Sequence, residues 1–185
     1  MQPSPEPETG SLEDERIVLR CQLGERAAFD DLIRRWAAPV AAYARRVSQD
    51  EDAAADLAQD IWLRAFRGID RLREPRRFRS WLFGIAHRAF ADALRRRYAT
   101  PAFVSDEIED VADDGAGDHE DMDRMELGLA KLPPVEREVL TLFYLQELAL
   151  EEIADVLAIP AGTVKSRLHR ARRLLRQELE EGERT

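Results

Sequence analysis

The chain has 185 residues, of which 44% are hydrophobic and 35% are charged, a composition typical of one large or two small globular domains. It lacks the roughly 18 consecutive apolar residues of a membrane-spanning helix, and residues 1–10 do not resemble a signal peptide, so we expect a cytoplasmic protein without membrane insertion. Its single cysteine, Cys21, excludes an intrachain disulfide and a cysteine-based metal cluster.

The charges are distributed unevenly along the chain. The net charge is −9, but residues 25–98 carry 16 basic and 11 acidic residues, and residues 99–126 carry one basic and 11 acidic residues. A third segment, Thr163 to Gln177, holds six basic residues and no acidic one. A phosphate backbone responds to charge within about 10 Å. The acidic total therefore does not exclude nucleic-acid binding by the two basic segments.

The pattern predicts an all-α fold of two small helical domains joined by a flexible acidic linker. We expect a disordered tail at 1–11 and a first domain at 12–98, with Pro39 starting a new helix because an interior proline is costly. Ser48 and Glu51 have the spacing of a capping box and should open a helix that runs to Gly68. Apolar residues at helical spacing form the expected buried stripes of these helices: Phe29, Leu32, Ile33, Trp36, Val40, Tyr43, Val47, Leu57, Ala58, Ile61, Ala65 and Ile69.

A basic loop and an aromatic helix complete the first domain. The loop carries Arg71, Arg73, Arg76 and Arg77 around Pro75, and a helix is predicted from about 78 to 98. Its aromatic residues favour either the core or the stacking of unpaired bases, and the core is favoured for Trp81. The residues in question are Phe78, Trp81, Phe83 and Phe90.

Residues 99–124 form the expected linker. The segment is dense in like charges and contains Gly115 and Gly117, which oppose a packed core. It is either a solvated tether or an acidic mimic of DNA.

The second domain is expected at 125–185. A helix should start at Pro134 or Val135 and bury Val135, Val139, Leu142 and Phe143. A second helix is expected at about 150–158, and a third at about 163–179. Four residues of the third should face inward: Val164, Leu168, Ala171 and Leu175.

The last two helices have the properties of a helix–turn–helix. Ala154 is small enough for close helix approach, and Pro160 with Gly162 provides a tight turn. Burying the apolar face of the last helix leaves its cationic residues outward, where they can reach base edges and phosphates. The alternative is a solvated cationic helix end.

The acidic edge of the helix after Ser48 also has two interpretations. It is either a solvated face or a docking surface for a basic partner. That edge consists of Asp52, Asp56, Gln59 and Asp60.

The order and spacing of three motifs resemble the extracytoplasmic-function (ECF, group IV) sigma factors of the sigma-70 family. The segment 56–66 resembles region 2.2, and 78–86 with Asp92 and 94–97 resembles regions 2.3 and 2.4. The segment 152–171 is close to region 4.2. Ala149 stands where a Ser or Thr often caps the region 4 helix, a loss that typically costs about 1 kcal/mol.

The resemblance implies a subunit that binds core RNA polymerase, recognises the −35 and −10 promoter elements and melts DNA. Its implied partners are the β′ coiled coil and β flap of core polymerase, promoter DNA and an anti-sigma factor, with a monomeric free chain. The resemblance assigns docking on the β′ coiled coil to Asp56, Gln59, Asp60 and Leu63. It assigns recognition of the −35 element to Thr163, Lys165, Ser166, Arg167, His169, Arg170, Arg173 and Arg176. It assigns recognition and melting of the −10 element to Arg71, Arg73, Arg76, Arg77, Trp81, His87, Arg88, Arg95 and Arg96.

Catalytic chemistry is not indicated. The three histidines are scattered through the chain, and no glycine-rich phosphate loop or nucleophile triad is present, so we expect no catalytic residues, metal site or cofactor. Cys21 is expected to be a buried thiol rather than a redox sensor. The competing functional hypotheses are a helix–turn–helix regulator that acts without core polymerase and an adaptor that uses its helices only for protein contacts.

Overall fold

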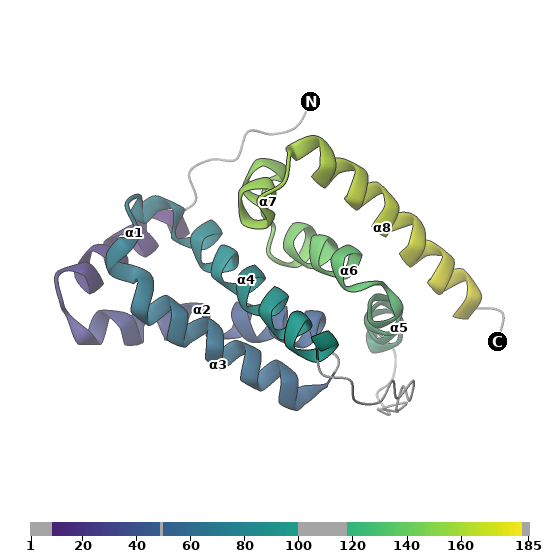
Figure 1. The fold of residues 1–185 in the computed structure, drawn as a ribbon, viewed down its shortest axis with the longest axis horizontal. Helices are drawn as coiled ribbons and strands as arrows, with labels where there is room; N and C mark the ends of the chain where they lie inside the picture. The colour runs from purple at the N-terminus through teal and green to yellow at the C-terminus, as the bar shows by residue number, and fades with distance from the viewer. Residues whose placement is uncertain (1–8, 49, 100–117, 183–185) are drawn as a thin grey trace.

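The computed structural model describes residues 9–48, 50–99 and 118–182, and these residues form helices and connecting turns without a β-strand (Figure 1). The expected all-α fold is confirmed. The first half contains α1 (Thr9–Gln22), α2 (Arg26–Val47), α3 (Glu51–Gly68), the 3-10 turns η1 (Ile69–Arg71) and η2 (Pro75–Arg77), and α4 (Phe78–Ala99). The second half contains α5 (Asp118–Lys131), α6 (Pro134–Leu140), a π-helical turn (Thr141–Leu145), α7 (Leu150–Leu157) and α8 (Ala161–Gly182).

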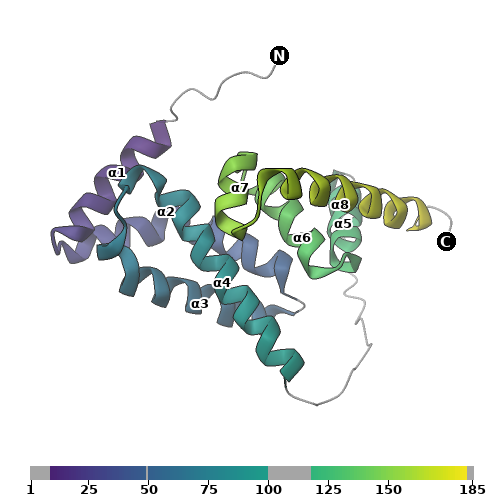
Figure 2. The same ribbon diagram turned by 45° about the horizontal axis from the view of Figure 1, so that its top comes forward.

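The first half is a bundle in which α2, α3 and α4 share a core. The predicted stripes supply that core, because Leu32, Tyr43, Ile61 and Leu82 are completely buried. Figure 2 shows α3 and α4 running side by side below α7 and α8. No helix within the described part of the chain is long and apolar enough to cross a membrane.

Helix α2 is continuous, so the prediction that Pro39 begins a new helix was wrong. Proline lacks the N–H that a helix interior uses, which normally breaks a helix. Here the stripe continues on both sides of Pro39, with Leu32 and Val40 both fully buried. Burial of that continuous stripe outweighs the loss of one backbone hydrogen bond.

The start of α3 also differs from prediction. Asp50, not Ser48, is the N-cap residue, and its carboxylate accepts a hydrogen bond of 2.7 Å from the backbone N–H of Ala53. Ser48 instead ends α2, where its backbone N–H donates to the carbonyl of Ala44.

Two expected boundaries shift as well. Helix α1 begins at Thr9, inside the expected tail of 1–11, and α5 begins at Asp118, inside the expected linker of 99–124. Acidic residues at the start of a helix are favoured by the helix dipole, so the charge run that predicted a tether also suits a helix N-terminus. Residues 1–8 and 100–117 lie outside the described residues, and with them the choice between tether and DNA mimic.

The second half packs α6, α7 and α8 together. Val139, Leu142, Ile153 and Val164 are fully buried at its centre. Val135 is 43% exposed, so its predicted burial was wrong. The helical register changes where α6 passes into the π-helical turn, and the buried face of α6 includes polar residues that an apolar pattern does not mark. These buried polar residues are Glu136, Arg137, Glu138 and Thr141.

Candidate nucleic-acid interface

The turn between α7 and α8 fixes the orientation of the predicted reading helix. Ala158 adopts a left-handed backbone conformation with φ of 53°, which ends α7. The carbonyl of Pro160 then accepts the backbone N–H groups of Thr163 and Val164 at 2.8 and 3.1 Å, which starts α8. Ala149 lacks a capping side chain, but Glu152 accepts a 2.9 Å hydrogen bond from the Ala149 backbone N–H. One half of a capping box is therefore retained.

Helix α8 turns its apolar face inward as predicted. Val164, Leu168 and Ala171 are buried, whereas Leu175 is half-buried. Of the eight residues expected to meet the −35 element, two are half-buried, Thr163 and Arg167. The other six are exposed: Lys165, Ser166, His169, Arg170, Arg173 and Arg176. The structure therefore brings all eight onto one helix, with a cationic surface that is open to solvent.

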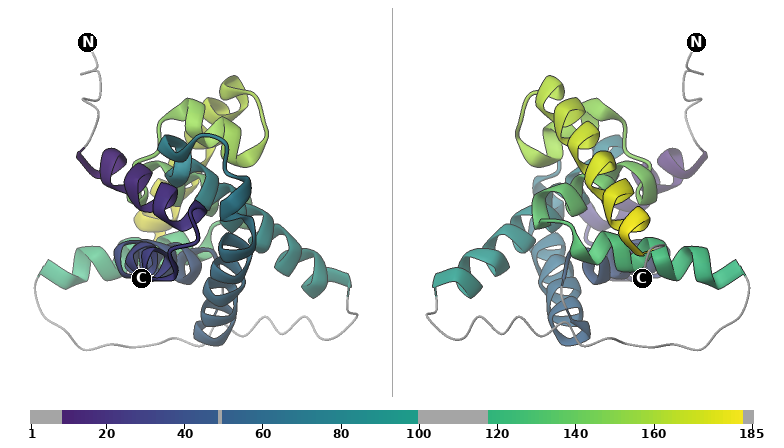
Figure 3. Two further views of the ribbon diagram at one scale, coloured as in Figure 1. Left: turned by 90° about the vertical axis from the view of Figure 1, so that its left-hand side faces the viewer. Right: turned by 90° about the vertical axis from the view of Figure 1, so that its right-hand side faces the viewer.

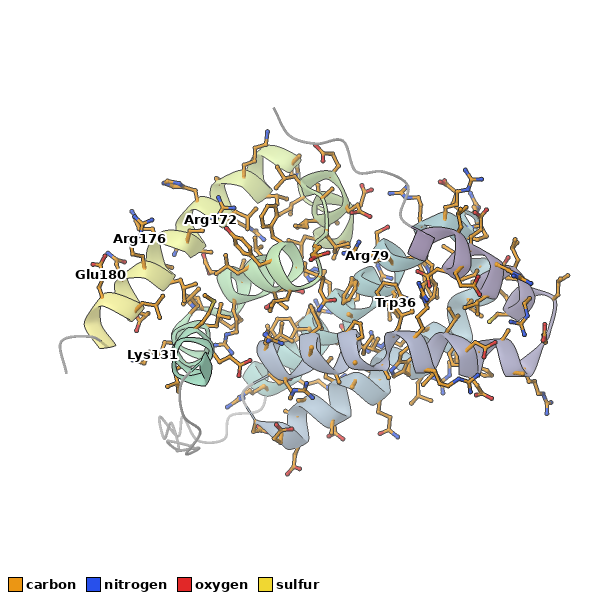
Figure 4. The ribbon with its side chains drawn as sticks, turned by 180° about the vertical axis from the view of Figure 1, so that it is seen from behind. Trp36, Arg79, Lys131, Arg172, Arg176 and Glu180 are labelled. Carbon is orange, nitrogen blue, oxygen red and sulfur yellow. The ribbon has the colours of Figure 1, made fainter. Side chains whose placement is uncertain are left out.

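Two arginines of α8 are held by the elements beneath it. The Nε of Arg170 lies 3.2 Å from the buried carboxylate of Glu136. Arg172, which Figure 4 labels on α8, is the second. Its Nε donates to the Tyr144 hydroxyl at 2.7 Å, and its guanidinium lies over the rings of Phe143 and Tyr144. Both contacts reach the second half's own helices, so these guanidinium groups are positioned before any ligand binds.

The basic loop before α4 is held by a residue that sequence reasoning missed. The side-chain amide of Gln22 donates to the carbonyls of Ile69 and Leu72 at 3.0 and 2.8 Å. Leu72 is itself buried, so the loop is attached to the bundle at two points. Its four predicted DNA-binding arginines are all exposed: Arg71, Arg73, Arg76 and Arg77. Long-range hydrogen bonds of this kind carry no local sequence signal.

Most aromatic residues of α4 belong to the core. Phe78, Phe83 and Phe90 are buried, which removes them from any direct contact with bases. Trp81 is half-buried and packs against Phe78 with ring centroids 5.8 Å apart. Its remaining surface lines a cavity of about 250 Å³. Arg73, Arg77 and Arg88 line the same cavity, together with Leu72, Glu74, Ser80, Gly84 and Asp155. An aromatic wall with three cations suits an unstacked base and its phosphate.

The remaining residues expected at the −10 element divide into two groups. Arg88, Arg95 and Arg96 are exposed on α4, and Arg95 forms an ion pair with Asp92. Asp92 also lies 2.7 Å from Arg64 of α3, whose guanidinium lowers the pKa of that carboxyl. His87 behaves differently, because its Nδ1 lies 2.9 Å from Glu138 of α6. The structure therefore points His87 at the second half of the chain.

The acidic edge of α3 borders an apolar patch. Asp56 and Gln59 are exposed, whereas Asp60 is half-buried and forms an ion pair with Arg64 at 2.8 Å. Leu63 is 47% exposed, and Phe66, which sequence reasoning missed, is 61% exposed. Phe66 meets Phe29 of α2 edge to face with centroids 5.0 Å apart. The sequence signal for this patch is that both apolar residues fall outside the buried stripe of α3.

Metal-binding chemistry finds no support in residues 9–48, 50–99 and 118–182, which contain no cluster of three or more His, Cys, Asp or Glu side chains that could hold a metal ion. Cys21 is buried, and desolvation raises the pKa of its thiol to about 11. This agrees with the prediction of a buried thiol, because a redox-sensing cysteine needs an accessible thiolate.

Comparison with known proteins identifies both halves. Residues 32–100 match sigma-70 region 2, and residues 122–175 match sigma-70 region 4. The chain is 31% identical over 176 residues to the ECF RNA polymerase sigma factor SigW of Bacillus subtilis, a match that covers 88% of this chain and 94% of SigW. It is 30% identical over 183 residues to the RNA polymerase sigma-H factor of Pseudomonas aeruginosa, which covers 91% of this chain and 94% of that factor.

The fold agrees with these relatives. The structure of CnrH in complex with the cytosolic domain of CnrY superposes with a TM-score of 0.69 at 27% identity, covering 91% of this chain and 97% of CnrH. The sigma factor RpoE of Bartonella quintana, in complex with the anti-sigma factor NepR, superposes with a TM-score of 0.66 at 25% identity, covering 81% and 97%. The chain belongs to the ECF sigma factors of the sigma-70 family, the subunits of RNA polymerase that recognise promoters.

Proposed function

We propose that each of the three surfaces described above carries one step of promoter recognition. The exposed cations of α8 read the −35 element, and the basic loop with the outer face of α4 binds and melts the −10 element. The acidic edge of α3, with Leu63 and Phe66, docks on the β′ coiled coil of core polymerase. The chain takes no catalytic part itself, because these surfaces supply binding and positioning groups only.

One observation carries this proposal. Helix α8 exposes its basic face over more than two turns while its apolar face is buried against α6 and α7. A helix held in this way by a preceding helix and a tight turn is the geometry that enters a major groove. Lys165 lies near the helix N-terminus, where base edges are reached, and Arg176 lies three turns later, where a phosphate is reached.

The partners and the cellular location are inferred from membership of the family. We propose that the second half contacts the β flap and that an anti-sigma factor controls the chain, since the CnrH and RpoE structures both contain a bound partner. Membership of group IV and a cytoplasmic, nucleoid-associated location belong to the same proposal. Regions 12–98 and 125–185 are the two functional domains, and 99–124 connects them.

The experiment compares Lys165→Ala with Arg176→Ala in the enzyme reconstituted with core polymerase. Lys165→Ala should cost about 1–3 kcal/mol and relax base preference at one or two −35 positions. Arg176→Ala should weaken binding to all sequences alike and lower the salt slope by roughly one unit. Binding to a panel of −35 variants at two salt concentrations distinguishes them. If Lys165→Ala weakens every sequence equally, the helix does not read the −35 element through this residue.

A further inference from the structure

Helix α1 has no assigned contact with DNA or with polymerase, yet it packs against the basic loop at residues 69–77. Gln22, the half-buried last residue of α1, donates from its side-chain amide to the carbonyl of Ile69 at 3.0 Å and to the carbonyl of Leu72 at 2.8 Å. An amide has two N–H donors, and both find an acceptor here. One side chain from outside the loop therefore holds two of its backbone carbonyls.

The backbone hydrogen bonds of the loop itself are local. The N–H of Leu72 donates to the carbonyl of Ile69 at 3.1 Å, and the N–H of Arg77 donates to the carbonyl of Glu74 at 2.9 Å. Each bond joins residues three apart and shapes one 3-10 turn without attaching the loop to the bundle. Residues 72–74 lie between the two turns, outside any helix. The order of this segment therefore depends on side-chain contacts with the bundle.

A second residue of α1 contacts the other end of the loop. Glu15 lies seven residues before Gln22, on the same face of the helix. Its carboxylate accepts a 2.9 Å hydrogen bond from the Nε of Arg76. The Arg76 side chain is 75% exposed, and exposed ion pairs contribute little to stability. The two hydrogen bonds of Gln22 are therefore the main polar attachment that α1 provides for the loop.

The loop that Gln22 holds forms one wall of the cavity beside Trp81. Leu72 lines this cavity with its side chain, and its carbonyl accepts from Gln22. The opposite wall is formed by α4, through Trp81 and Arg88. The position of the loop on α1 thus sets the width of the cavity in which an unpaired base would lie against Trp81. The other lining residues from the loop are Arg73, Glu74 and Arg77.

We propose that Gln22 is a positioning residue for recognition of the −10 element, which orders the loop wall of this cavity before an unpaired base enters. The proposal rests on the assignment of the −10 surface under the proposed function. Gln22 acts through the backbone of the loop rather than by touching DNA. A loop that is already ordered loses no conformational freedom when a base binds, so the benefit falls on the sequence that fits the cavity. Two hydrogen bonds change the population of an ordered loop by a factor of roughly 5–150.

The test replaces the amide without removing any cation. Gln22→Met keeps an unbranched side chain of similar length and has no donor. Gln22→Glu keeps the shape of glutamine and, at pH 8, presents a carboxylate without donors to the two carbonyls. Gln177→Met is the matched control, because it makes the same exchange at an exposed position of α8.

The variants are assayed as holoenzyme, reconstituted with core polymerase. The probe is a fluorescein-labelled promoter fragment whose non-template strand is unpaired over the −10 element, with the sequence of a start site that depends on the chain. A second probe has the −10 bases scrambled. Affinities are measured at two salt concentrations, and the helicity of each free chain is recorded.

Gln22→Met should lower the affinity for the native −10 probe about tenfold and the affinity for the scrambled probe less than about twofold. Binding without sequence preference depends on the arginines, which all remain, so the salt slope should not change. Gln22→Glu should reduce the native-to-scrambled ratio at least as much. Gln177→Met should leave both affinities within about twofold of wild type.

A wild-type ratio in helical Gln22→Met and Gln22→Glu chains overturns the inference. Equal weakening on both probes also overturns it, because the defect would then be one of folding or charge. If Gln22→Met is not helical, the ratio for Gln22→Glu decides, since that side chain has the shape of the original. The wild-type holoenzyme separates the two proposals. Discrimination by the wild type and by both Gln22 variants rejects only the positioning role, whereas a wild type that binds both probes equally rejects −10 recognition and this inference together.

Discussion

At the scale of one residue, Ala158 has a backbone conformation that its side chain disfavours. Its φ of 53° and ψ of 44° place it in the left-handed region, where a Cβ atom crowds the following carbonyl oxygen. Glycine is the usual residue at this position after a helix, because it has no Cβ. The turn that aims α8 therefore contains local strain that the packing of α7 and α8 outweighs.

Replacing Ala158 with glycine should stabilise the protein. The relief of about 1–2 kcal/mol exceeds the entropic cost of glycine, so Ala158→Gly should raise the free energy of unfolding by about 0.5–1 kcal/mol. Ala55→Gly is the control, since Ala55 is exposed in the interior of α3 and glycine there should destabilise by a similar amount. Urea unfolding measures both. Destabilisation by both substitutions would show that position 158 is not strained.

At the scale of one element, the start of α3 allows a direct test of which residue caps the helix. Asp50→Ala removes the carboxylate that accepts from Ala53, and should cost about 1 kcal/mol of unfolding free energy. Ser48→Ala should change stability by less than about 0.5 kcal/mol, because the Ser48 side chain caps no helix here. Urea titrations of the two variants decide between the caps. A larger effect at Ser48 than at Asp50 would reverse the assignment.

Most of the helices were predictable because apolar residues at helical spacing indicate which face of a helix is buried. The periodicities identified the bundle stripes, the helix–turn–helix and the exposed cations of α8, since each depends on neighbours three or four residues apart. Pro39 was misjudged because the apolar stripe on both sides of it matters more than one missing N–H. Val135 was misjudged because polar residues, which an apolar pattern does not mark, occupy the buried face of α6.

At the scale of the whole molecule, the contact between the halves was not predictable. The sequence around Glu138 is that of an ordinary helical glutamate. No pattern in the neighbouring residues indicates its contact with Tyr43, which lies 95 residues earlier in the chain. The contacts of Gln22, which holds the basic loop, are equally long-range and leave no local signal. Phe66, which extends the patch beside Asp60, could have been found as an apolar residue outside the buried stripe of α3. Figures 1 and 3 place α3 and α8 on opposite sides of the molecule, so polymerase docking and −35 reading would use separate faces.

Charge reversal on α3 should separate polymerase docking from folding. Asp56→Arg with Asp60→Arg should weaken core-polymerase binding at least about tenfold in a pull-down, because opposed charges are replaced by like charges. Helicity should be unchanged, since Asp56 is exposed and the Asp60–Arg64 pair contributes less than about 1 kcal/mol. Glu151→Arg with Glu180→Arg changes the net charge equally on exposed positions of the second half. Equal losses in both double variants would reject docking through α3.

Promoter-dependent initiation is the measurement that tests the central claim most directly. Core polymerase is incubated with genomic DNA from the organism that encodes this chain, with and without the chain, and transcript 5′ ends are mapped. We expect chain-dependent starts that share one pair of upstream elements near −35 and −10, and their loss when Arg76 and Arg77 are both replaced by alanine. The same start sites with and without the chain would contradict the account.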